Sequence, residues 1–84
     1  MARVTRNFAG SYSVRRPDGT VVATIENGHV AELDNDREWL VTLRRYNSTL
    51  GWHDADGDIV PNLRTGKKIA LDHARVLMTT AAGY

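Results

Sequence analysis

An alternation of side chains with a period of two recurs along the first 60 residues, and turn-forming residues interrupt it. Residues 11–16 alternate small polar with larger side chains, and residues 20–26 are rich in β-branched types. Pro17-Asp18-Gly19 between them has the composition of a tight turn, so the two runs predict a β-hairpin. Residues 39–46 give the strongest strand prediction, both by pattern and by composition.

The other predicted strands depend on turn residues. Asn27-Gly28 is a strong hairpin signal, because a type I′ turn needs positive φ at both central positions. Residues 29–33 after it can form either a third strand or one irregular helical turn. Residues 50–53 and 58–60 predict two short strands joined by a turn at residues 54–57. These segments predict an antiparallel β-meander of about five strands.

The pattern changes near the C-terminus. Thr65 can cap a helix, and from Lys67 the apolar residues recur at helical spacing, which predicts an α-helix over residues 66–82. His73 lies on the apolar stripe and is expected to be a core-edge residue with one hydrogen bond. The predicted fold class is α+β, with one C-terminal helix packed on one face of the sheet. The stripe consists of Ile69, Ala70, His73, Ala74, Leu77 and Met78.

Strand parity assigns side chains to the two faces of the predicted sheet. The face expected to meet the helix carries Tyr12, Val14, Val21, Ala23, Ile25, Trp39, Val41 and Leu43. The opposite face carries Ser11, Ser13, Arg15, Val22, Thr24, Glu26, Leu40, Thr42 and Arg44. Since no second helix is predicted, we expect this second face to be uncovered.

The chain has 84 residues, for which we expect one domain over residues 1–84. A domain of this size has a small core, and without cysteine it cannot add disulfide bonds, so self-association is an alternative source of stability. Because Asp18 is the first acidic residue, residues 1–7 are predicted to form a basic N-terminal arm that can be flexible. The net charge of +1 is far below that of proteins that coat nucleic acid.

The sequence contains no motif typical of catalysis or metal binding. The acidic cluster that begins at Asp54 does not fit a calcium loop, because its sixth and twelfth positions are Ile59 and Thr65. The three histidines are too dispersed for a zinc motif, and no nucleophile elbow or phosphate-binding loop is present. We therefore expect a protein that is not an enzyme, with no metal, no cofactor and no small-molecule substrate.

Two resemblances rest on these features. The order of strands followed by a helix that opens with Thr65-Gly66-Lys67-Lys68 is similar to the small β-sheet DNA-binding domains of plant transcription factors and phage-integrase arms. The extra strands and the acidic stretch from Glu26 to Glu38 depart from that pattern. Residues 19–25 and 68–75, with a composition weighted toward Ala, Arg, Asp, Val and Thr, resemble small accessory proteins of actinobacterial phages. That resemblance implies binding to a host or phage macromolecule.

The expected location is the cytoplasm, which would be that of the bacterial host for a phage protein. The N-terminal residues lack the apolar segment of a signal peptide. No stretch approaches the roughly 18 apolar residues of a membrane span, so no membrane partner is expected.

Two functions fit these observations. The first is a non-enzymatic interaction domain that binds a host or phage protein, or a second copy of the chain, through the uncovered sheet face or a sheet edge. The second is a nucleic-acid-binding module, in which arginines of the sheet and of the N-terminal arm contact phosphate. The candidate binding residues are Arg3, Arg6, Arg15, Val22, Leu40, Thr42, Arg44 and Arg45.

Overall fold

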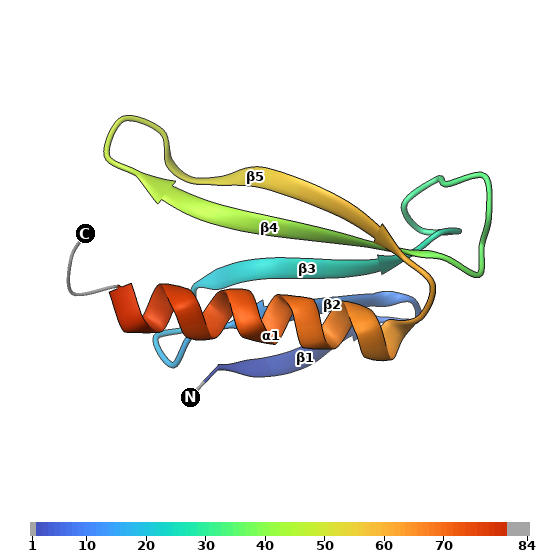
Figure 1. The fold of residues 1–84 in the computed structure, drawn as a ribbon, viewed down its shortest axis with the longest axis horizontal. Coiled ribbons are helices and arrows are strands. Elements are labelled where there is room, and N and C mark those ends of the chain that lie inside the picture. Colours follow the sequence, from blue (N-terminus) through green and yellow to red (C-terminus); the bar gives the residue numbers. More distant parts are fainter. Residues whose placement is uncertain (1, 81–84) are drawn as a thin grey trace.

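The computed structural model describes residues 2–80. In this part of the chain, five strands form one antiparallel sheet in which each strand pairs with the next along the sequence, and a helix follows. The helix lies across one face of the sheet (Figure 1). The predicted α+β meander with a C-terminal helix on one sheet face is therefore confirmed. The elements are β1 (Arg3–Phe8), β2 (Ser11–Arg15), β3 (Val21–Asn27), β4 (Trp39–Asn47), β5 (Gly51–Val60) and α1 (Leu63–Thr80).

The core lies between α1 and the central strands β3 and β4. Ile25 and Val41 are fully buried there, and Val60 is 3% exposed. Gly66 faces all three from the helix: a Cβ built on it would lie 3.1 Å from Ile25 Cγ2, 3.2 Å from Val41 Cγ2 and 3.4 Å from Val60 Cγ2. The absence of a side chain at this position lets the first turns of α1 approach the sheet closely. Buried Ala70 and Ala74 continue this contact along the helix.

The face assignment is correct for Ala23, Ile25 and Val41 and wrong for Val21 and Val22, which exchange faces. Val14 pairs with Ala23, but Arg15 pairs with Val21, so the register shifts at this point and Val22 is an extra residue. Directly paired residues share a face, and the bulge therefore moves Val21 to the side of Arg15. Val22 is fully buried and belongs to the hydrophobic core.

The N-terminal residues form a strand instead of the predicted arm. Arg3–Phe8 make up β1 and pair with β2, and Thr5 Oγ1 donates a hydrogen bond to the Ser13 carbonyl at 3.4 Å. Val4 packs against the core and Ala2 does the same. The contacts of Ala2 and Val4 with the core help to hold β1 at the edge of the sheet. In the sequence these two residues are less conspicuous than Arg3 and Arg6, which led to the prediction of a basic arm.

The helix begins at Leu63, three residues before the predicted start. Asn62, and not Thr65, is the N-cap: Asn62 Oδ1 accepts a hydrogen bond from the backbone N–H of Thr65 at 2.8 Å. The side chain of Met78 and the predicted helical residues 81–82 lie outside the part of the chain that can be described.

The loop between β3 and β4 differs from the predicted Asn27-Gly28 hairpin turn. Gly28 does not have positive φ, and glycine is required for another reason, since a Cβ would clash with the carbonyl oxygen of Asn35. Of the two alternatives for residues 29–33, the helical turn is closer: the N–H of Ala31 donates to the Asn27 carbonyl at 2.9 Å, four residues back. The strand alternative is wrong.

Strand β5 continues through residues 54–57, where a turn was predicted. Gly57 pairs with Thr42 and Asp56 pairs with Leu43, after which a register shift leaves Ala55 as an extra residue. Aspartate and glycine are tolerated here because β5 is an exposed edge strand, where charges and bulges are common.

We expect Gly66→Leu to destabilise the fold by roughly 1–3 kcal/mol, because the new side chain would overlap the three buried residues that face this position. The loss should exceed the gain of about 1 kcal/mol from removing a helical glycine. Urea unfolding would measure it. Arg64→Leu, at an exposed position of the same helix, is the control and should change stability by less than about 0.5 kcal/mol. Equal stability of Gly66→Leu and the wild type would contradict the close seating of α1.

Candidate interaction surface

The face of the sheet opposite α1, called the uncovered face below, presents its side chains in rows that cross the strands. The rows follow from the pairing of strands, because residues directly opposite one another share a face. The Leu40 row consists of Phe8, Ser11, Glu26, Leu40 and Ile59. The Thr42 row consists of Thr5, Ser13, Thr24, Thr42 and Gly57. The Arg15 row consists of Arg3, Arg15 and Val21, and Arg44 and Asp54 pair at the same level on β4 and β5.

The Leu40 row ends in an exposed apolar side chain at each edge of the sheet. Phe8 on β1 is 57% exposed and Ile59 on β5 is 51% exposed. Leu40 lies beside Ile59 and is half-buried. Tyr46, 46% exposed, belongs to the same face at the far end of β4. Adjoining apolar side chains on a surface without a covering element, such as Leu40 and Ile59, are typical of interaction sites.

The middle of the uncovered face carries hydroxyl side chains. Ser11 and Ser13 are each only 5% exposed. Asn7 Nδ2 donates to Ser13 Oγ at 2.8 Å and to Ser11 Oγ at 3.3 Å, which fixes both serines. Thr24 and Thr42 are half-buried beside them. The centre of the uncovered face is therefore polar.

The guanidinium group of Arg44 makes its contacts with other groups of the same chain. It lies where β4 separates from β3, beyond the last β3–β4 pair, Ala23 with Leu43. Its Nη1 donates to the Val21 carbonyl at 3.3 Å and its Nη2 to the Trp52 carbonyl at 3.1 Å. Nε lies 3.4 Å from Asp54 Oδ1, an ion-pair distance, but makes no hydrogen bond. Arg44 thus joins β3 to β5 across β4.

His73 stabilises the same point from the helix. Its Nε2 donates to the carbonyl of Arg44 at 2.7 Å, since a carbonyl can only accept. The expectation of a core-edge histidine with one hydrogen bond is confirmed. The backbone group that β4 exposes where it leaves β3 is satisfied in this way.

The other candidate arginines do not converge on one site. Arg15 donates to the Gly19 carbonyl at 3.0 Å, and Arg45 Nε lies 3.5 Å from Asp56 Oδ2. Arg6 pairs with Tyr12, whose ring lies 5.2 Å from the Lys67 ammonium of α1, so Arg6 lies on the helix side. Arg3 is exposed on the uncovered face. The eight candidate residues therefore do not form one site. Four share the uncovered face: Arg3, Arg15, Leu40 and Thr42. Arg44 belongs to that face too, but its guanidinium is bonded to backbone carbonyls of the chain. Arg6 and Arg45 lie on the helix side, and Val22 is in the core.

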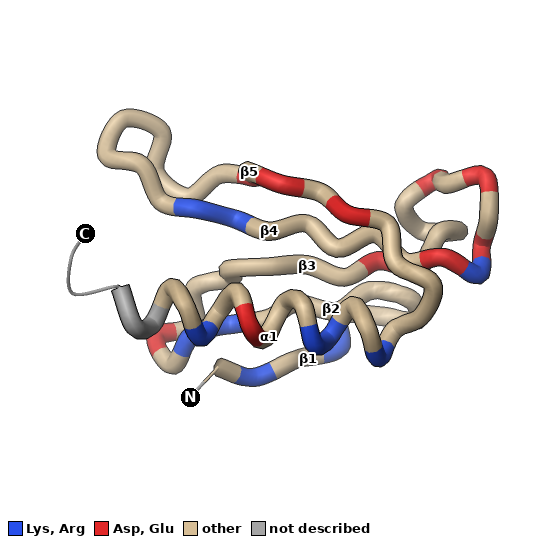
Figure 2. Tube along the Cα trace, in the orientation of Figure 1, with Lys and Arg blue, Asp and Glu red and all other residues tan. Residues whose placement is uncertain are grey.

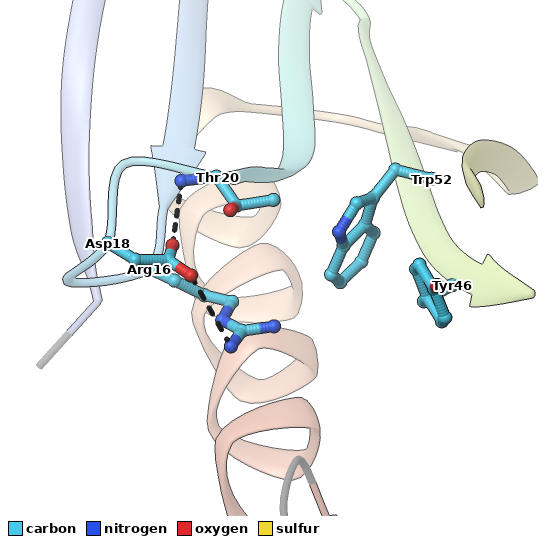
Figure 3. A pocket seen from close by; sticks show the side chains of 5 residues that line it. All are labelled: Arg16, Asp18, Thr20, Tyr46 and Trp52. Atoms are coloured by element: carbon cyan, nitrogen blue, oxygen red, sulfur yellow. Dashed lines mark hydrogen bonds and ion pairs between the residues drawn. The ribbon is translucent and has the colours of Figure 1, made fainter. Parts of the chain in front are cut away.

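Five further residues line a pocket that the sequence did not indicate. The pocket has a volume of about 290 Å³ and lies between the β2–β3 turn and the β4–β5 hairpin (Figure 3). The Arg16 guanidinium lies 5.7 Å from the centroid of the Trp52 ring, and the rings of Trp52 and Tyr46 meet edge to face at 5.9 Å. Asp18 and Thr20 complete the lining. The volume is at the lower limit of ligand pockets and suits a single partner side chain.

Phe8 and Ile59 were also missed by the sequence analysis. Ile59 has the parity of the uncovered face once β5 is taken as one strand, so the alternation from Gly57 to Ile59 was the available signal. Phe8 follows a register shift between Arg6 and Phe8 that sequence does not reveal.

Within residues 2–80, no group of three histidine or acidic side chains is placed to hold a metal ion. No helix in this part of the chain is long and apolar enough to cross a membrane. Comparison with known proteins found no matching family model, no matching curated protein and no matching solved structure.

Arg44→Gln should destabilise the protein by roughly 1.5–3 kcal/mol, because it removes hydrogen bonds of a charged group to two carbonyls. Arg45→Gln removes only an exposed ion pair and should cost less than about 1 kcal/mol. Urea unfolding of both variants makes the comparison. If Arg45→Gln cost as much as Arg44→Gln, the internal role assigned to Arg44 would be wrong.

The pKa of Asp18 is lowered from 3.8, mainly because its carboxylate accepts a hydrogen bond from the backbone N–H of Thr20, at 2.9 Å. Since the folded-state pKa is below the unfolded one, the bond contributes to the turn above the unfolded pKa and is lost as pH falls through the folded value. We expect the NMR shift of the Thr20 amide to titrate with a midpoint below 3.8. A midpoint at or above that value would mean that the turn bond does not form in solution.

Proposed function

We propose that the chain is a non-enzymatic interaction domain that binds a protein partner through the uncovered face. The observation that carries the proposal is the placement of Phe8, Ile59 and Tyr46 on the one sheet face that has no helix. Exposed aromatic and aliphatic side chains around a polar centre match the composition of protein–protein interfaces. The Trp52–Arg16 pocket at the end of this face would accept one side chain of the partner.

The size of the face is sufficient for such a role. The molecule measures 38 × 25 × 19 Å, and the sheet spreads over the two longer dimensions (Figure 1). A standard interface buries about 800 Å² on each partner, and the 38 × 25 Å extent of the molecule sets the scale of the face that can supply it.

Nucleic-acid binding is the second candidate, favoured by the adjacent Arg3 and Arg15 beside the Thr42 row. It has less support, because Arg15, Arg44 and Arg45 each bond to groups of the chain itself. Phosphate binding needs several cations that face one backbone. The exposed apolar residues have no role in such contacts.

The test uses a photo-crosslinking amino acid at Phe8 or at Ile59, in the chain expressed in its native host. We expect both positions to crosslink the same partner, and Val76, which is 59% exposed on α1, to be the matched position that does not. Ile59→Asn should reduce the yield from Phe8 at least about tenfold, since a few large side chains supply most of the energy of an interface. Val76→Asn should leave it unchanged.

Equal crosslinking from Val76 and Ile59 would refute binding through the uncovered face. A titration with mixed-sequence duplex DNA at two salt concentrations tests the second candidate. Strongly salt-dependent binding that Arg3→Glu abolishes and Ile59→Asn leaves intact would favour nucleic acid as the partner.

A further inference from the structure

The two edges of the sheet carry opposite charge. On β1 the charged residues are Arg3 and Arg6, and on β5 they are Asp54, Asp56 and Asp58. Figure 2 shows the acidic residues along β5 and basic residues on β1, at opposite sides of the sheet. Each of these strands pairs with one neighbour only within the described residues, so its outer backbone groups face outward.

The edge charges are available for contact. Arg3 and Arg6 are exposed. Neither forms an ion pair with another residue in the described part of the chain. Asp58 is exposed and has no ion pair there either. Asp54 and Asp56 meet Arg44 and Arg45, yet their side chains are 74% and 59% exposed.

We propose that the β1 edge of one copy pairs with the β5 edge of a second copy, so that the sheet continues from molecule to molecule. In an antiparallel meander of five strands, β1 and β5 run in the same direction. A second copy with its helix on the same side therefore adds its β1 parallel to β5. The contact is head to tail, so a pair of copies keeps one free β1 edge and one free β5 edge, of opposite charge.

A register exists in which both arginines meet aspartates on matching faces. In the antiparallel β4–β5 pair, the four residues from Val41 to Arg44 span the stretch from Asp58 to Asp54, because Ala55 is an extra residue. The four residues 3–6 of a second copy can span the same stretch on the outer side of β5, running parallel to it. Arg3 then lies beside Asp54 on the uncovered face, and Arg6 lies beside Asp58 on the helix face.

The charges also select against the symmetric alternatives. Pairing β1 with β1 would bring arginine to arginine, and pairing β5 with β5 would bring aspartate to aspartate. Like charges across strands are destabilising. Charged edges usually protect a sheet from further pairing. With opposite signs at the two edges, that protection acts only between like edges.

Sedimentation velocity at about 20 mM and about 500 mM salt tests the proposal, because the Debye length shortens several-fold between them. The wild-type chain should increase in mass with concentration at low salt and should do so at least about tenfold more weakly at high salt. Arg6→Glu alone and Asp58→Arg alone should each remain monomeric, since each creates one edge pair of like charge.

An equimolar mixture of Arg6→Glu and Asp58→Arg should recover association, because the two altered edges then complement each other. Arg64→Glu, the same charge change at an exposed helical position, is the control and should associate like the wild type. A monomeric wild type at low salt, or failure of the mixture to recover with both variants folded by circular dichroism, would overturn edge pairing. If Arg6→Glu does not fold, Arg6→Gln should weaken association.

Discussion

The close contact of α1 with the centre of the sheet determines the rest of the molecule. Gly66 brings the helix backbone down onto Ile25, Val41 and Val60, which are buried there, and the fully buried Ala70 and Ala74 follow it along the helix. A helix seated this closely covers the middle of one face and leaves both edge strands with little cover. The described residues form one helix, α1, so the face without a helix and the two edge strands follow from where this small-residue contact seats it.

The alternation of β3 and β4 was sufficient to predict which residues meet the helix, because a half-buried strand must bury every second side chain. Ile25 and Val41 follow that rule. Val22 does not, since one extra residue at a bulge reverses the faces beyond it, and nothing in the sequence marks the bulge. Strand β1 was missed for another reason: Val4 provides its main apolar contact with the core, and its arginines are what the sequence displays.

Turn-forming residues were reliable only where the backbone itself needs them. Gly19 has φ of 90° in the β2–β3 turn, as a tight turn requires. Gly28 instead leaves room for a loop that folds back on Asn35, and Gly57 lies inside an exposed strand. The arginines show the same limit for the site. Arg15 on β2 and Arg44 on β4 belong to the same face of the sheet, yet only the separation of β4 from β3 explains why Arg44 is held by two carbonyls.

Contacts through the uncovered face and contacts through the sheet edges would lie in perpendicular directions. Edge pairing uses backbone and charges in the plane of the sheet, whereas Phe8, Ile59 and Tyr46 project out of that plane. Copies joined through β1 and β5 with their helices on one side would align their uncovered faces on the other. Phe8 of one copy would then lie near Ile59 of the next, because these residues end the same row at opposite edges. The two apolar ends would merge into one larger contact at each junction. A partner that spans a junction would bind an assembled row more tightly than a single copy, because two linked contacts act at high effective concentration.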